Sequence, residues 1–171
     1  AKGVIRVQTC HHAGMSAKSP AFELNTSEDN MSVTETNELI TITSGDLSLE
    51  ITKLPWSMTY KHKGRVLSRS GRKDLALMKT DWKGYAYDKG DYTDTYIRQQ
   101  LSMGVGELLY GFGERFTPFV KNGQSIDIFN QDGGTSTEQS YKNIPFYVSN
   151  KGYGVFVNHP EKVSFEVGTE M

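Results

Sequence analysis

Asp132 is the side chain in this sequence best placed to do chemistry with a ligand. It lies in the polar run Asn-Gln-Asp-Gly-Gly-Thr-Ser-Thr-Glu-Gln at 130–139, where Gly133 and Gly134 favour a tight, uncrowded turn. Thr135, Ser136 and Thr137 add hydroxyl groups close to the carboxylate in the sequence. Such groups on an exposed loop suit the hydroxyl groups of a sugar, because each accepts or donates hydrogen bonds in several directions. The pattern predicts either a sugar-binding loop or a simple polar turn.

The other residue types that carry chemistry form no recognisable constellation. The four histidines, at positions 11, 12, 62 and 159, lack the local spacing of zinc ligands. Gly104/Gly106 and Gly111/Gly113 lack the third glycine of a dinucleotide-binding motif, so we interpret both pairs as bulges or turns beside strands. We therefore expect no metal and no cofactor.

The elements around Asp132 are short segments in which apolar and polar residues alternate. The clearest are 39–43 and 47–52, which flank Ser-Gly-Asp and predict a hairpin, and 56–60 and 65–67, which predict a second one. A run at 4–9 also alternates, whereas 15–37 is polar and rich in turn residues. About ten short strands and no convincing helix emerge. This predicts an all-β fold, an antiparallel β-sandwich.

An unusual stretch at 81–94 interleaves aspartates with aromatic residues. Its aspartates at 88, 91 and 94 do not match the spacing of a calcium loop, so we interpret the stretch as a solvated acidic loop. The interleaved tyrosines either pack this loop onto the sandwich or stack on sugar rings.

Length and charge narrow the class of protein. The 171 residues fit one domain, 1–171. The 19 Lys and Arg residues balance 20 Asp and Glu residues, so the protein has no net positive charge that would attract nucleic acid. No apolar run is long enough to span a membrane. The single cysteine, Cys10, fits a reducing compartment, and the start is unlike a signal peptide, so we expect a cytoplasmic location. Both ends read as cut from a longer protein.

Three segments together resemble the family 31 glycoside hydrolases, in their bacterial α-xylosidase branch. They are Val-Gly-Glu-Leu-Leu-Tyr-Gly-Phe-Gly-Glu-Arg-Phe at 105–116, the run from Asn130 to Tyr147 that contains Tyr-Lys-Asn-Ile-Pro-Phe-Tyr, and Gly-Tyr-Gly-Val-Phe-Val-Asn-His-Pro at 152–160. The resemblance is dense over 104–170 and loose before that. It implies an N-terminal β-sandwich of the galactose-mutarotase-like type, placed ahead of a catalytic (β/α)8 barrel.

The resemblance also implies a division of labour between sandwich and barrel. The barrel of the parent enzyme supplies two aspartates that hydrolyse α-linked sugars with retention, so no catalytic residue is expected in this chain. The sandwich sends a loop to the leaving-group sugar, and the matching substrate-binding residue is Asp132, with Gln131 and Thr135 as further candidates. Gln131 stands where α-glucosidase relatives carry arginine. The implied partners are a xylose-containing α-linked oligosaccharide and the parent's own barrel; pairing with a second copy of the chain stays open.

Two further functions remain open at the level of sequence. One is a stand-alone carbohydrate-binding module that uses the aromatic residues of 82–96. The other is a mutarotase-like sugar epimerase, which needs a histidine acid and a carboxylate base in one cleft. His159 and Glu166 are the nearest such pair in the sequence.

Overall fold

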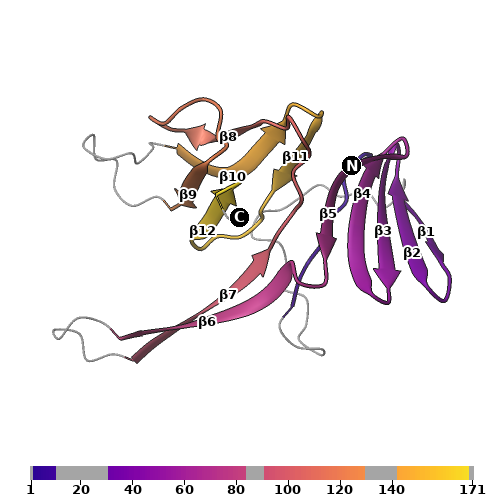
Figure 1. The fold of residues 1–171 in the computed structure, drawn as a ribbon, viewed down its shortest axis with the longest axis horizontal. Coiled ribbons are helices and arrows are strands. Elements are labelled where there is room, and N and C mark those ends of the chain that lie inside the picture. The colour runs from indigo at the N-terminus through magenta and orange to yellow at the C-terminus, as the bar shows by residue number, and fades with distance from the viewer. Residues whose placement is uncertain (1, 11–30, 84–90, 130–141, 170–171) are drawn as a thin grey trace. The chain divides into compact units, whose positions relative to one another are not determined.

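The regular secondary structure of the described part of the chain consists of β-strands. The computed structural model describes residues 2–10, 31–83, 91–129 and 142–169. These residues contain twelve strands, every paired couple antiparallel and none of them helical, which confirms the predicted all-β class. They divide into two compact units with the boundary between Ser102 and Met103 (Figure 1). No helix among them is long and apolar enough to cross a membrane.

The first unit contains a five-stranded sheet in which every strand pairs with its neighbour in the sequence (Figure 1). Its strands are β1 (Met31–Glu35), β2 (Leu39–Ser44), β3 (Leu47–Lys53), β4 (Trp56–His62) and β5 (Arg65–Gly71). Gly45, with φ of 61°, makes the turn between β2 and β3, and Gly64, with φ of 79°, makes that between β4 and β5. Both predicted hairpins are confirmed.

The five-stranded sheet has one apolar and one polar face. The register places Ile42 opposite Leu49 and Leu49 opposite Tyr60, so these residues share a face on which Leu49 is 1% exposed. Short polar and charged side chains occupy the other face in facing positions: Thr34, Thr41, Glu50, Thr59 and Arg69. The period-two pattern of 47–52 predicted this separation, because successive side chains of a strand point to opposite faces.

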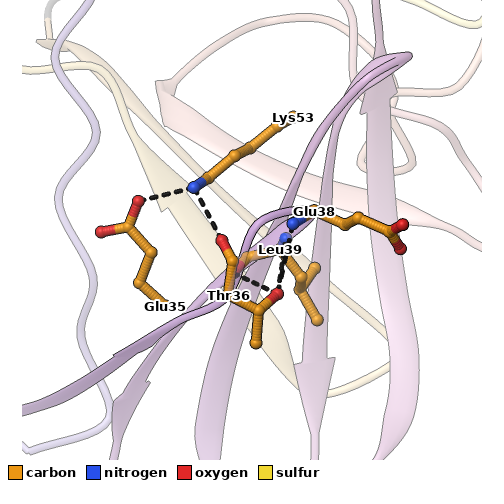
Figure 2. Close-up of polar contacts among 5 residues, drawn as sticks. All are labelled: Glu35, Thr36, Glu38, Leu39 and Lys53. Atoms are coloured by element: carbon orange, nitrogen blue, oxygen red, sulfur yellow. Dashed lines mark hydrogen bonds and ion pairs between the residues drawn. The ribbon is translucent and has the colours of Figure 1, made fainter.

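Edge strand β1 is fastened through its turn into β2 (Figure 2). Thr36 Oγ1 accepts hydrogen bonds from the backbone N–H groups of Glu38 and Leu39, at 3.3 and 3.0 Å. Lys53 Nζ lies 2.6 Å from Glu35 Oε1 and donates to the carbonyl oxygen of Thr36 at 2.7 Å. An exposed ion pair of this kind contributes about 0–1 kcal/mol. The turn therefore holds β1 mainly through its backbone bonds.

Three expectations for the first unit were wrong. Residues 4–9 form no strand, and the side chains of Val4 and Val7 are exposed. Conversely, β1 lies in the polar run 15–37, whose turn residues predict mostly loop. The described residues of 81–94, namely 81–83 and 91–94, are also strand, because β6 (Leu75–Lys83) and β7 (Asp91–Gln99) pair along their full length. Tyr, Trp and Thr favour extended backbone even when charged residues interrupt their alternation.

The second unit is a small sandwich of two sheets around one core. β10 (Lys142–Ser149) lies between β11 (Tyr153–Phe156) and β8 (Leu109–Glu114), and β9 (Gln124–Ile128) pairs with β12 (Val163–Val167) (Figure 1). Both sheets contribute to the buried cluster of Leu109, Phe112, Ile126, Ile128, Tyr147 and Val167. The ring of Phe112 is fully buried, with its centroid 4.8 Å from that of Phe165. Sandwich packing of antiparallel sheets is confirmed for this unit.

Candidate functional site

The structure describes the two strand ends between which the predicted sugar-contacting residues lie. Gln131, Asp132 and Thr135 themselves fall outside the described residues, so their role stays a prediction. On one side the described chain ends with Phe129 after β9, and on the other it resumes at Lys142, the first residue of β10. The candidate site is therefore the set of described side chains that hold these two ends.

Arg115 and Asn143 join the ends of three strands. Arg115 lies just after β8 and donates through Nη1 to Asn143 Oδ1 at 2.5 Å and through Nη2 to the carbonyl oxygen of Asp127 at 2.8 Å. Asn143 Nδ2 in turn donates to the carbonyl oxygen of Phe129 at 3.2 Å. The fork of a guanidinium group fixes direction as well as distance. Phe129 and Asn143, which flank the segment 130–141, are thus connected directly.

An irregularity in the pairing of β8 with β10 lies just before Arg115, where the single residue Phe112 of β8 faces residues 144–146 of β10. Gly111, Phe112 and Gly113 have φ of 119°, 67° and 89°, a run of left-handed backbone that turns Phe112 into the core. A Cβ at Gly113 would lie 1.9 Å from the carbonyl oxygen of Lys142, so no other residue fits there without a shift of β10. The pairing of β8 with β10 changes register at this point. The prediction that Gly111 and Gly113 mark a bulge is confirmed.

Charged side chains around the network are themselves held in place. Burial acts to raise the pKa of Asp127, but hydrogen bonds from Lys162 and Ser164 and the charges of Lys162 and Arg115 outweigh it and hold this pKa below its usual value. Lys162 Nζ lies 2.7 Å from Asp127 Oδ2. Burial and the charge of Arg115 lower the pKa of Lys121, whose Nζ donates to the carbonyl oxygen of Pro118 at 2.7 Å.

A shallow polar hollow of about 250 Å³ adjoins Arg115. Thr117, Pro118, Gln124, Ser125 and Ile126 complete its lining. Gln124 Oε1 is buried and has no hydrogen-bond partner among the described residues. An acceptor in that position suits an ordered water, which needs polar partners and little space.

A second polar cluster, around Glu107 at the far end of β10, stabilises the fold. Glu107 is 3% exposed, and its carboxylate accepts hydrogen bonds from Ser149 Oγ at 2.5 Å and from the backbone N–H of Gly104 at 2.7 Å. Burial raises its pKa, but the bonds from Ser149, Tyr153 and Gly104 and the charge of Lys151 outweigh that and lower the pKa overall. Burial and the bond to Glu107 raise the pKa of Tyr153. A carboxylate so fully bonded stabilises the loop that precedes β8.

The residues suggested for an epimerase have other partners in the structure. His159 Nε2 lies 3.5 Å from Glu161 Oε2. Glu166 Oε2 accepts hydrogen bonds from Ser125 Oγ and Thr169 Oγ1, each at 2.5 Å. No group of three or more His, Cys, Asp or Glu residues that could hold a metal ion occurs in the described part of the chain.

Sequence reasoning missed Arg115 and Asn143 as site residues. Both lie inside the segments that carry the family resemblance, but their contact spans 28 positions of sequence. The one local signal is Gly-Phe-Gly directly before Glu-Arg, since a bulge redirects the residues that follow it.

Comparison with known proteins supports the interpretation of these segments. Residues 1–166 match the model of the glycosyl hydrolase 31 N-terminal galactose mutarotase-like domain. An α-xylosidase of Emericella nidulans is 45% identical over an aligned length of 181 residues, and the alignment covers 99% of this chain and 23% of the relative. An α-xylosidase of Lactiplantibacillus pentosus is 41% identical over 93% of this chain and 20% of its own length. The chain thus spans less than a quarter of the curated relatives it matches.

Solved structures share the fold at lower identity. The cycloalternan-forming enzyme of Listeria monocytogenes, in complex with a pentasaccharide substrate, matches with a TM-score of 0.68 at 21% identity, over 92% of this chain and 14% of that one. A GH31 α-xylosidase from a soil metagenome, complexed with xylose, matches with a TM-score of 0.67 at 14% identity, over 91% of this chain and 24% of that one.

Proposed function

This chain belongs to the family of glycosyl hydrolase 31 N-terminal galactose mutarotase-like domains, and from that premise we propose that it serves a retaining α-glycosidase of α-xylosidase type as its accessory domain. The observation that carries the proposal is the identity of 41–45% to two α-xylosidases over nearly the whole chain. The substrate class that follows is a xylose-containing α-linked oligosaccharide.

In this proposal the domain contributes to the subsite of the leaving-group sugar. Asp132 accepts a hydrogen bond from a sugar hydroxyl, and Gln131 and Thr135 supply further polar contacts. The support is the network of Arg115 and Asn143, which fixes the residues on either side of the segment that contains all three. Holding both ends of a segment reduces the conformational freedom that has to be lost when a ligand binds to it.

The catalytic groups of the proposed enzyme lie in its remaining polypeptide. We therefore expect the chain alone to release no nitrophenol from a nitrophenyl α-xyloside, while the full-length parent enzyme releases it steadily. Turnover by the chain alone, at a rate above that of a buffer blank, would contradict the assignment of an accessory role.

The substitution Asp132→Ala in the full-length parent tests the subsite. Loss of one hydrogen bond to a charged group removes about 1.5–3 kcal/mol, so kcat/KM on an α-xylosyl disaccharide should fall about 10–150-fold. A nitrophenyl α-xyloside has no leaving-group sugar, and its kcat/KM should change little. Asp46→Ala is the matched control, because Asp46 is an exposed aspartate that, like Asp132, stands next to a glycine in the sequence. Equal kinetics of wild type and Asp132→Ala on the disaccharide would refute the assignment.

A further inference from the structure

The polar hollow beside Arg115 carries hydrogen-bonding groups that the fold itself does not use. Thr117 Oγ1 accepts a hydrogen bond from Lys121 Nζ at 3.0 Å, and the hydroxyl hydrogen of Thr117 is donated to no described residue. Ser125 Oγ donates its hydrogen to Glu166 Oε2 at 2.5 Å, so its lone pairs remain available as acceptors. Because both hydroxyl groups line the hollow, its wall offers a donor and an acceptor to a ligand.

Gln124 adds a second acceptor, and the fold fixes the orientation of its amide group. Its Nε2 donates to the carbonyl oxygen of Val120 at 2.7 Å and to that of Pro118 at 3.4 Å. A carbonyl oxygen only accepts, so the amide nitrogen must face these two groups and Oε1 must face away from them. Oε1 is buried and has no partner among the described residues. A buried acceptor without a donor costs stability, and a ligand with a hydroxyl group can supply that donor.

These groups determine the chemical class of the ligand. An anion such as acetate has no hydrogen to donate to Gln124 Oε1 or to Ser125 Oγ. A cation meets the guanidinium group of Arg115, which is a fixed positive charge in the wall of the hollow. An apolar molecule leaves the polar groups without partners. A hydroxyl group both donates and accepts, so a neutral molecule with several hydroxyl groups satisfies the donor and the acceptors together.

The size of the hollow restricts the ligand to one small ring. Its volume of about 250 Å³ lies below the roughly 300–1,000 Å³ that is typical of sites for drug-sized molecules. It corresponds to about eight water molecules, at about 30 Å³ for each in the liquid. Pro118 and Ile126 add apolar surface between the polar groups, which suits the C–H groups of a sugar ring.

We propose that the hollow binds a single neutral pyranose ring through its hydroxyl groups. These accept a hydrogen bond from Thr117 Oγ1 and donate to Gln124 Oε1 and Ser125 Oγ. A sugar that makes these bonds replaces the water that otherwise fills the hollow without loss of polar contacts. The site consists of β9 and the loop between β8 and β9, and the inference goes beyond the proposed function without depending on it. The ring is either a free monosaccharide or one residue of an oligosaccharide.

Protection of an introduced thiol tests whether a sugar occupies the hollow. The full-length parent enzyme carries Ser125→Cys, because Ser125 is exposed and lines the hollow. Iodoacetamide alkylates the thiol in the presence or absence of xylose, and mass spectrometry of the peptide that contains position 125 gives the rate. We expect saturating xylose to slow this alkylation severalfold. Because few hydrogen bonds hold the ring, the half-protecting concentration should be on the order of millimolar.

Ser164→Cys is the matched control for this experiment. Ser164 lies on β12, the partner strand of β9, and donates to Asp127 Oδ1 at 2.6 Å, much as Ser125 donates to Glu166. It is also exposed, but it does not line the hollow. Xylose should therefore leave the rate of alkylation at position 164 unchanged.

Two further variants make the test specific. Thr117→Val removes the proposed donor and keeps the shape of the side chain. In the background of Ser125→Cys it should raise the half-protecting concentration about 2–10-fold, the range expected for one neutral hydrogen bond. Pro118→Cys places a thiol at the other exposed residue of the lining and is the probe to use if Ser125→Cys does not fold.

The choice of ligand separates the remaining outcomes. Protection by xylose identifies a free monosaccharide as sufficient, whereas protection only by a thio-linked, hydrolysis-resistant xylosyl disaccharide identifies one residue of an oligosaccharide. Protection by acetate in place of the sugars, equal protection of Ser125→Cys and Ser164→Cys, or no protection at positions 125 and 118 would overturn the proposal. The kinetics of Asp132→Ala on the disaccharide are measured separately, so the proposed function and the sugar site in the hollow can fail independently.

Discussion

In the full-length parent enzyme, the substitution Asn143→Ala removes both hydrogen bonds that this side chain makes in the network with Arg115 and Phe129. It removes the oxygen that accepts from Arg115 and the N–H that donates to the carbonyl oxygen of Phe129. One of these bonds involves a charge and the other is neutral, and both are partly exposed. From the low ends of about 1.5–3 and 0.5–1.5 kcal/mol, we expect a loss of about 2 kcal/mol in the stability of the domain.

The kinetic effect of Asn143→Ala should depend on the substrate. If the network positions Asp132, a displacement of about 1 Å lowers kcat/KM on the disaccharide by up to about 100-fold. The loss should not exceed that of Asp132→Ala. Hydrolysis of the nitrophenyl α-xyloside should be preserved. In the background of Asp132→Ala, Asn143→Ala should add little, because residues that act through one contact are not additive.

Asn150→Ala is the matched control for this substitution. Asn150 lies just past the other end of β10, where its Oδ1 accepts from the N–H of Leu108 and its Nδ2 donates to the carbonyl oxygen of Gly106, each at 3.1 Å. The Asn150→Ala variant therefore loses a comparable pair of bonds at the opposite end of β10 from Asn143. The melting temperature of the Asn150→Ala variant should fall, while its kinetics on both substrates should stay those of the wild type. An equal loss on both substrates for Asn143→Ala, or additive losses with Asp132→Ala, would refute the positioning role.

Two further predictions concern stability. Gly113→Ala places a Cβ against the carbonyl oxygen of Lys142 at positive φ, so it should lower the free energy of unfolding by about 3 kcal/mol or more. The control is Gly152→Ala, whose φ is also positive but whose surroundings are open, and it should cost about 1–2 kcal/mol. Urea unfolding checks both, and equal midpoints would contradict the close approach. The pKa of Glu107 is lowered in the fold, so the unfolded chain takes up its proton first as pH falls, and the stabilisation present above pH 4.5 is lost below it. Glu107→Gln should weaken this loss in unfolding curves taken from pH 7 to 3, and an unchanged pH dependence would contradict it.

The hairpins of the first unit were predictable because their signals are local. Residues 47–52 alternate strictly, and their register with 39–44 follows from the turn at Gly45. Strand β1 was missed because the polar residues around it resemble a loop, and it is fixed by pairing with β2. The opposite error at 4–9 has the same origin. Alternation there is not accompanied by a strand partner in the structure.

The site was predictable only in part because its geometry is long-range. The polar, glycine-rich sequence around Asp132 points to a binding loop, and the family resemblance names the sugar. Arg115 looks like an ordinary solvated charge until the bulge at Gly113 and the start of β10 are brought together. Only the paired strands reveal its bonds to Asn143 and Asp127.

The order of strand pairing has a consequence for synthesis on the ribosome. In the first sheet each strand pairs with the one made just before it, so the sheet can form while the chain emerges. In the second unit β8 can pair only after β10 has been synthesised, and β9 only after β12. The buried core is therefore complete only when Val167 has been added. Until then Leu109, Phe112, Ile126 and Ile128 have no cover, and such surface promotes aggregation. We therefore expect nascent chains stalled between residues 130 and 160 to be the species that chaperones bind.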